Sequence, residues 1–219
     1  MKHKHMIQIA TVGLCFGGLA NAMTVYDVDF SVDDEGATHS ENDLAATSGG
    51  TFNGQNWTTS WGSVLTDRTT NEFITSGGVM VVQDWGGSGT LTSDTINITS
   101  SGTFDFSGSA VTVSDGLAFN VGSEGFEWFY AINGGTEVAF GGVGQGFGGS
   151  DVGDGVDLSA SVTDIAVSNG DTLQVGFNFD VNGADDGFEV SSMSVDVIPE
   201  PSTALLSVLG FLALLRRRG

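Results

Sequence analysis

Cysteine, proline and histidine are scarce in this chain. Its 219 residues include one cysteine, Cys15, and two prolines, Pro199 and Pro201. Cys15 lies in a segment that we expect to be cleaved off, so disulfides, thiolate metal sites and cysteine nucleophiles are excluded from the mature protein. That segment also holds two of the three histidines. A Ser-His-Asp triad would have to use His39, which lies in a polar stretch, so we expect no such triad.

Positive charge is nearly absent away from the two chain ends. Between Met23 and Ile198 the one lysine or arginine is Arg68, against 26 of the 27 acidic residues, which gives this body a net charge of −25. Such a body repels nucleic acid and anionic lipid headgroups, and it attracts cations, calcium foremost. We therefore expect no nucleic-acid partner.

Glycine, by contrast, is abundant. The 34 glycines, together with many Ser, Thr, Asn and Asp residues, favour turns over helices. The chain still has enough apolar material for a core, since 40% of its residues are hydrophobic and 15 are phenylalanine. The eight glycines between residues 141 and 155 predict a loop there.

Apolar and polar residues alternate along most of the body, which is typical of half-buried strands. Tyr26 and Val28, for example, alternate with Asp27 and Asp29. Asn133-Gly134-Gly135 predicts a hairpin turn. About ten such strands predict an all-β fold for residues 23–197, an antiparallel, jelly-roll-like β-sandwich, with a closed barrel as the alternative.

The N-terminus has the features of a secretory signal peptide. Lys2 and Lys4 precede an apolar stretch that ends at Leu19, and Ala20 and Ala22 give the small-x-small pattern that a signal peptidase accepts. We therefore expect residues 1–22 to form a signal helix that is cleaved before Met23.

The C-terminus, residues 198–219, combines three unlike elements. Pro199, Glu200 and Pro201 form a stiff, extended tripeptide, which an enzyme could bind without unfolding it. A short apolar run follows, and we expect it to form a hydrophobic helix. The run is followed by three arginines, Arg216, Arg217 and Arg218. Their positive charges would stay on the cytoplasmic side of a membrane.

This order of elements resembles the PEP-CTERM sorting signal of Gram-negative bacteria. The resemblance implies that an exosortase cuts the chain near Pro199-Glu200-Pro201 after transient anchoring in the inner membrane. It also implies a place at the cell surface or in the extracellular matrix, where such proteins accompany exopolysaccharide and biofilm. A plain membrane anchor that is retained is the alternative.

Two parts of the body resemble the jelly-roll modules of extracellular bacterial proteins, some of which bind carbohydrate. They are residues 123–140, with the aromatic strand Phe126 to Tyr130, and residues 171–198. Glu127 lies beside Trp128 on the aromatic strand and is the acid that we would test for glycoside hydrolysis, although a solvent-facing role in an alternating strand is the more common one.

Oxygen-bearing side chains and tryptophans are the remaining candidates for a site. A calcium site is predicted at a glycine-containing turn, with hard oxygen ligands from Asp180, Asn182, Asp185, Asp186 and Glu189. Its spacing departs from that of an EF-hand, because Asp185 stands where that loop requires glycine. The hypothesis for glycan contact names three tryptophans beside polar residues, Trp57, Trp61 and Trp85, although tryptophans of a sandwich more often lie in its core.

We therefore expect an exported, non-enzymatic β-sandwich with glycan contact and calcium support. Two alternatives stay open at this point. One is a secreted enzyme acting on polysaccharide, and the other is a purely structural matrix protein.

Overall fold

The computed structural model describes most of the body of the chain. Residues 22–200 form one compact unit, and of the two chain ends, which form the other, only Arg216 is described. The described residues are 22–29, 50–52, 55–64, 72–76, 79–83, 87–114, 124–144, 153–181, 186–200 and 216.

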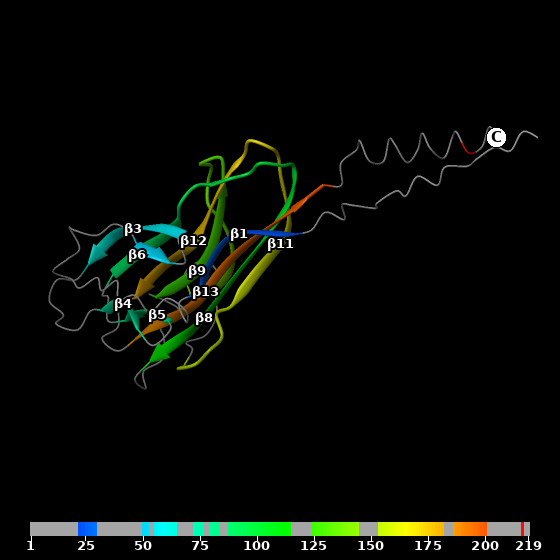
Figure 1. The fold of residues 1–219 in the computed structure, drawn as a ribbon. Helices are drawn as coiled ribbons and strands as arrows, with labels where there is room; N and C mark the ends of the chain where they lie inside the picture. Colours follow the sequence, from blue (N-terminus) through cyan, green and yellow to red (C-terminus); the bar gives the residue numbers. More distant parts are fainter. Residues whose placement is uncertain are drawn as a thin grey trace, which may run out of the picture. The chain divides into compact units, whose positions relative to one another are not determined.

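The described part of the body consists of thirteen β-strands (Figure 1). In chain order they are β1 (Met23–Asp29), β2 (Gly50–Phe52), β3 (Gln55–Val64), β4 (Glu72–Ser76), β5 (Val79–Gln83), β6 (Gly87–Ser93), β7 (Ile96–Asn97), β8 (Gly102–Ser114), β9 (Gly125–Ile132), β10 (Val138–Gly144), β11 (Ala160–Val167), β12 (Thr172–Val181) and β13 (Asp186–Pro199).

The strands form two antiparallel sheets. The six-stranded sheet has the order β11-β8-β13-β5-β4, with β1 also paired to β13, and the seven-stranded sheet has the order β10-β9-β12-β6-β3-β2, with β7 also paired to β12. Each sheet therefore keeps its own edge strands within the described residues. The expected sandwich of two antiparallel sheets is confirmed, and the closed barrel is not what forms.

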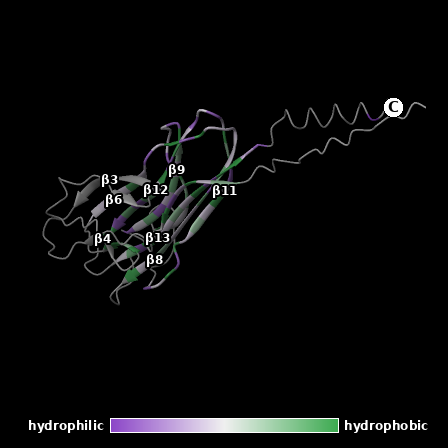
Figure 2. Cartoon of the chain, viewed as in Figure 1, coloured by the Kyte–Doolittle hydropathy of each residue, from purple (hydrophilic) through white to green (hydrophobic). Residues whose placement is uncertain are grey.

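Alternation of residue types explains why each sheet has an inner and an outer face. In β12, Leu173, Val175, Phe177, Phe179 and Val181 are buried and the intervening polar residues are half-buried. Hydrophobic and hydrophilic residues interleave along the strands in the same way (Figure 2). β-Branched and aromatic side chains pack well on a pleated, half-buried surface, so this pattern favours strands over helices.

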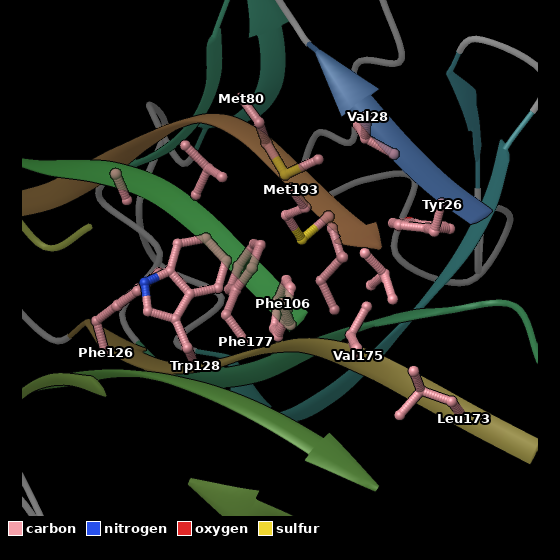
Figure 3. Packing of buried hydrophobic residues seen from close by; sticks show 14 of the residues in the cluster. Tyr26, Val28, Met80, Phe106, Phe126, Trp128, Leu173, Val175, Phe177 and Met193 are labelled. Atoms are coloured by element: carbon pink, nitrogen blue, oxygen red, sulfur yellow. The ribbon is translucent and has the colours of Figure 1, made fainter. Parts of the chain in front are cut away.

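The core lies between the two sheets and draws on both of them. Trp128 is fully buried and makes edge-to-face contacts with Phe106 of the six-stranded sheet and with Phe126 and Phe177 of its own. The rings and the neighbouring aliphatic side chains lie together in Figure 3. Edge-to-face pairs add to the stabilisation that burial of the rings already provides.

Local predictions are confirmed in part. Asn133 and Gly134 have φ angles of 55° and 63°, as a hairpin turn requires, and β9 pairs with β10 from Tyr130 and Val138 onward. The predicted loop at 141–155 is wrong at its start, because Gly141–Gly144 belong to β10. The body was expected to end at residue 197, whereas β13 continues through Pro199.

Both predicted terminal helices lie outside the described residues, except at Arg216, which is helical and exposed. No helix among the described residues is long and apolar enough to cross a membrane.

Candidate functional site

Three polar side chains from neighbouring strands lie in a row on the outer face of the seven-stranded sheet. Asn178 of β12 pairs with Glu127 of β9 on one side and with Thr90 of β6 on the other. Each of the three alternates with buried core residues, so it points away from the core. Residues directly opposite in an antiparallel pair share a face, which brings the three together.

Both the nitrogen and the oxygen of the Asn178 side chain are hydrogen-bonded. Its amide nitrogen Nδ2 donates to Glu127 Oε1 at 3.0 Å and to Glu137 Oε2 at 2.9 Å. Its oxygen Oδ1 accepts a 2.6 Å hydrogen bond from Thr90 Oγ1. An amide has two donors on nitrogen, and both are used here. The network therefore fixes which way the amide points and holds two glutamates beside it.

An open groove of about 180 Å³ runs beside this network. It is lined by Gly125, Phe126, Glu127, Asn178, Phe179 and Asp180. Gly125 pairs with Asp180 and has no side chain to fill the space above it. Because both Asn178 hydrogens are already used, the carboxylate oxygens of Glu127 and Asp180 are what the polar side chains offer a ligand.

Asp180 lies in a crowded negative environment. Burial raises the pKa of its carboxyl above the ordinary value, and the negative charge of Glu124 raises it further. Glu124 is itself fully buried. No lysine or arginine lies among the described residues of the body, so none of those residues offers a cationic side chain to offset these charges. The groove is therefore suited to ligands that donate hydrogen bonds, and it disfavours anions.

No protein-family model matches the sequence, and no curated protein matches it closely enough to count as a relative. Solved structures with a similar arrangement of strands do exist. TmCBM61, solved in complex with β-1,4-galactotriose, has a TM-score of 0.40 and 9% identity, over 76% of this chain and 92% of that one. The CBM22-1 xylan-binding domain of Paenibacillus barcinonensis Xyn10C has a TM-score of 0.38 and 10% identity, over 84% of this chain and 100% of that one.

A third similar structure is the K3 cleaved adhesin domain of Lys-gingipain from Porphyromonas gingivalis. Its TM-score is 0.38 and its identity 11%, over 79% of this chain and 98% of that one. All three TM-scores are below 0.5, so what these proteins bind says nothing about this chain.

The residues of the predicted calcium site do not all meet. Asp180 lies on the outer face of the seven-stranded sheet, whereas Glu189 alternates with the buried Phe188 and Val190 of β13 and so lies on the outer face of the other sheet. The core separates these faces, so one ion cannot bind both carboxylates. Asn182, Asp185 and the Asp186 side chain lie outside the described parts. Within those parts, no group of three acidic, histidine or cysteine residues could hold a metal.

The backbone positions of two predicted tryptophans are described. Trp57 and Trp61 belong to β3 and lie opposite Ser93 and Gly89 of β6, which are both buried. Their side chains, and the whole of Trp85, lie outside the described parts.

The predicted processing sites lie at the limits of the body. Ala22 is exposed just before β1, Pro199 ends β13, and Glu200 follows it as an exposed residue. Four other residues of these predictions lie outside the described parts: Ala20, Pro201, Arg217 and Arg218.

Sequence reasoning missed Thr90, Glu137 and Asn178. Asn178 stands in an ordinary alternating strand, between Phe177 and Phe179. The partners are 88, 51 and 41 residues away in the chain, so only the pairing of strands reveals them.

Proposed function

We propose that this chain is an exported bacterial protein whose β-sandwich, of the jelly-roll kind, binds a glycan in the groove beside Asn178. The observation that carries the proposal is the network in which one amide, in the wall of an open groove, bonds to Glu127 of the same wall and to the nearby Glu137. Carboxylates held in place accept hydrogen bonds from sugar hydroxyls at defined positions. An open groove, rather than a closed cavity, admits a segment of a long polymer.

Neutral polysaccharide is the class of ligand that fits best. The groove offers acceptors to hydroxyl donors, and the negative charge of Asp180 and its surroundings disfavours uronate or sulfate groups. The role we propose is binding, without catalysis and without a nucleic-acid partner.

The C-terminal segment supplies the export half of the proposal. Pro199-Glu200-Pro201, the apolar run and the three arginines support sorting by an exosortase after signal peptidase has removed residues 1–22. The product would act at the cell surface or in the extracellular matrix of a Gram-negative bacterium, where exopolysaccharide is the available glycan.

The groove lies far from the end of the body to which the tail is attached. The Glu200 amide donates to the Ser101 carbonyl, and the Asn169 amide donates to the Ser101 hydroxyl. β12 starts at Thr172, just after Asn169, and Asp180 lies eight residues further, about 26 Å along an extended strand. The glycan site therefore stays clear of the end at which the tail is processed.

Binding of the purified protein to a panel of neutral and anionic polysaccharides tests the proposal. Asn178→Ala removes the amide that holds both glutamates, so it should weaken binding by about tenfold or more, the effect of one to two hydrogen bonds. Glu189→Gln is the matched control, because it changes a carboxylate on the outer face of the opposite sheet. Equal losses in both variants, or no binding to any polysaccharide, would overturn the proposal.

Glycoside hydrolysis is the second candidate. Glu127 and Glu137 both bond to the same Asn178 nitrogen, so their bonded oxygens lie no more than about 6 Å apart, near the spacing of a retaining pair of carboxylates. Release of reducing sugar from a polysaccharide that the protein binds, lost in Glu127→Gln and Glu137→Gln, would favour this candidate. Binding without release supports the first.

A further inference from the structure

The end of β13 includes part of the stiff, extended segment that we expected an enzyme to bind without unfolding it. Ile198 pairs with Thr103 of β8, and Pro199 pairs with Gly102 (Figure 1 shows β13 along β8). Directly after the strand, the Glu200 amide donates a 2.9 Å hydrogen bond to the Ser101 carbonyl. Two of the three residues of Pro199-Glu200-Pro201 are therefore attached to the sandwich by their backbone.

The Glu200 hydrogen bond uses the only backbone donor in this tripeptide. Proline has no N–H, so Pro199 and Pro201 cannot donate. An enzyme cleft that binds the segment as an extended chain, strand against strand, has one N–H to bond with, and the Ser101 carbonyl already occupies it. The cleft and β8 therefore compete for the same group.

Close approach of the two strands depends on Gly102. A Cβ atom at position 102 would collide with the carbonyl oxygen of Ile198 and come within 2.9 Å of the Pro199 Cα. Backbone atoms cannot move aside as the end of a side chain can, so an alanine at this position would push the end of β13 away from β8.

β1 pairs with the other edge of β13 as far as Val197, the residue before Ile198. Met23 pairs with Val197, and Thr24 pairs with Asp196, to which its hydroxyl also donates. The first and last strands of the body thus lie side by side. Ile198, Pro199 and Glu200 come directly after this doubly paired stretch.

We propose that Pro199-Glu200 is a latch: a partner that binds the segment as an extended chain gains access only when the last β13–β8 pairs separate. The proposal rests on the proposed sorting function and adds its regulation. Folding of the body then competes with binding of the segment by its partner. We therefore expect the tail to be cleaved more slowly once the sandwich has folded.

The chain offers a clean test, because Pro199 and Pro201 are its only two prolines. A proline-specific endoprotease can therefore cut the full chain, held in detergent micelles, only at these two sites. We expect cleavage to be about tenfold slower, or more, than in a synthetic peptide of residues 192–205, because proteolysis follows the population of the open form. Equal rates in protein and peptide would overturn the latch.

Gly102→Ala and Gly153→Ala are matched variants. Gly102→Ala should raise the rate of cleavage toward that of the peptide. Gly153→Ala should leave it unchanged, because a Cβ at position 153 meets nothing within 4 Å. An unchanged rate in a folded Gly102→Ala protein would contradict the proposal.

Hydrogen exchange of the Glu200 amide in the unmodified protein gives a second measurement, which does not depend on whether a variant folds. We expect that amide to exchange slowly; exchange at the rate of the free peptide would overturn the proposal. Neither measurement uses an exosortase. If both succeed and co-expressed exosortase leaves the tail uncut, the latch stands and the proposed sorting function fails.

Discussion

The indole nitrogen of Trp128 donates a 2.8 Å hydrogen bond to the backbone carbonyl of Leu158. Trp128 lies at the centre of the core, and Leu158 lies just before β11. The stretch around Leu158 contacts β8 through the isolated bridge between Asp157 and Val111 and through backbone hydrogen bonds such as the one from the Leu158 amide to the Ala110 carbonyl. This bond therefore ties an irregular segment to the core of the sandwich.

Removal of that bond is the first prediction. Trp128→Phe leaves a buried carbonyl without its donor and loses part of the indole, so the free energy of unfolding should fall by about 3 kcal/mol. Chemical denaturation monitored by far-UV circular dichroism measures it. Gly108→Ala alone should also destabilise, by about 2 kcal/mol, because its Cβ would lie 2.6 Å from the Trp128 ring.

The double variant distinguishes this account from general damage to the core. A phenyl ring at 128 no longer reaches the position of the outer indole ring, so Gly108→Ala should cost less in that background. Strictly additive losses would show that the two residues do not share this space.

Tyr26 gives the second prediction. Its side chain is buried, and its hydroxyl has no hydrogen-bond partner among the residues that the structure describes. Tyr26→Phe removes this unsatisfied group, so it should leave stability unchanged or raise it by about 1 kcal/mol. Tyr26→Ala, which leaves a cavity instead, should cost about 3–5 kcal/mol. A clear loss of stability in Tyr26→Phe would mean that the hydroxyl is satisfied.

The same residue predicts a dependence on alkaline pH. Burial, and then the charge of Asp94, raise the pKa of Tyr26 well above its ordinary value of 10.0. A raised pKa gives stability that is fully present below pH 10 and is lost as the pH rises above it, because the unfolded chain ionises first. Melting temperatures above pH 10 should therefore fall less steeply in Tyr26→Phe than in the unmodified protein.

The period-two pattern was sufficient to predict strands and two antiparallel sheets, because side chains such as Phe177 and Phe179 must share one buried face. It was not sufficient to predict the site. Whether Asn178 meets Glu127 depends on the register between β12 and β9, which follows from packing of the whole core. Asp180 and Glu189 are near in sequence but lie on opposite sheets, since the chain crosses from β12 to β13 between them.

The third prediction concerns acidic pH, where two variants should have opposite effects on stability. The pKa of Asp171 is lowered by hydrogen bonds from the Asn133 side chain and the Ser168 amide, so its stabilising effect is present above the ordinary value of 3.8 and is lost as the pH falls below it. Asp171→Asn should therefore destabilise at pH 7 and destabilise less at pH 3.

Asp180 behaves in the reverse way. Its raised pKa makes the carboxyl favourable below its ordinary value of 3.8, and that contribution is lost as the pH rises through the folded-state pKa. Asp180→Asn should raise the melting temperature at pH 7 and leave it unchanged at pH 3. Thermal melts at the two pH values check both variants. If both variants shifted the melting temperature in the same direction at pH 7, the opposite effects assigned to these two carboxyls would be contradicted.

Thr90 gives the last prediction, on the role of orientation in the groove. Its hydroxyl donates to Asn178 Oδ1 and so holds the amide at the end opposite the two glutamates. Thr90→Val keeps the shape of the side chain and removes the donor. The amide is then held only by its two hydrogen bonds to the glutamates, so we expect glycan affinity to fall about threefold to tenfold, the effect of about one hydrogen bond. Thr90→Ser retains the hydroxyl and should bind as the unmodified protein does. Isothermal titration with the tightest-binding polysaccharide measures all three proteins, and equal affinities would mean that Asn178 does not need Thr90 to hold the site.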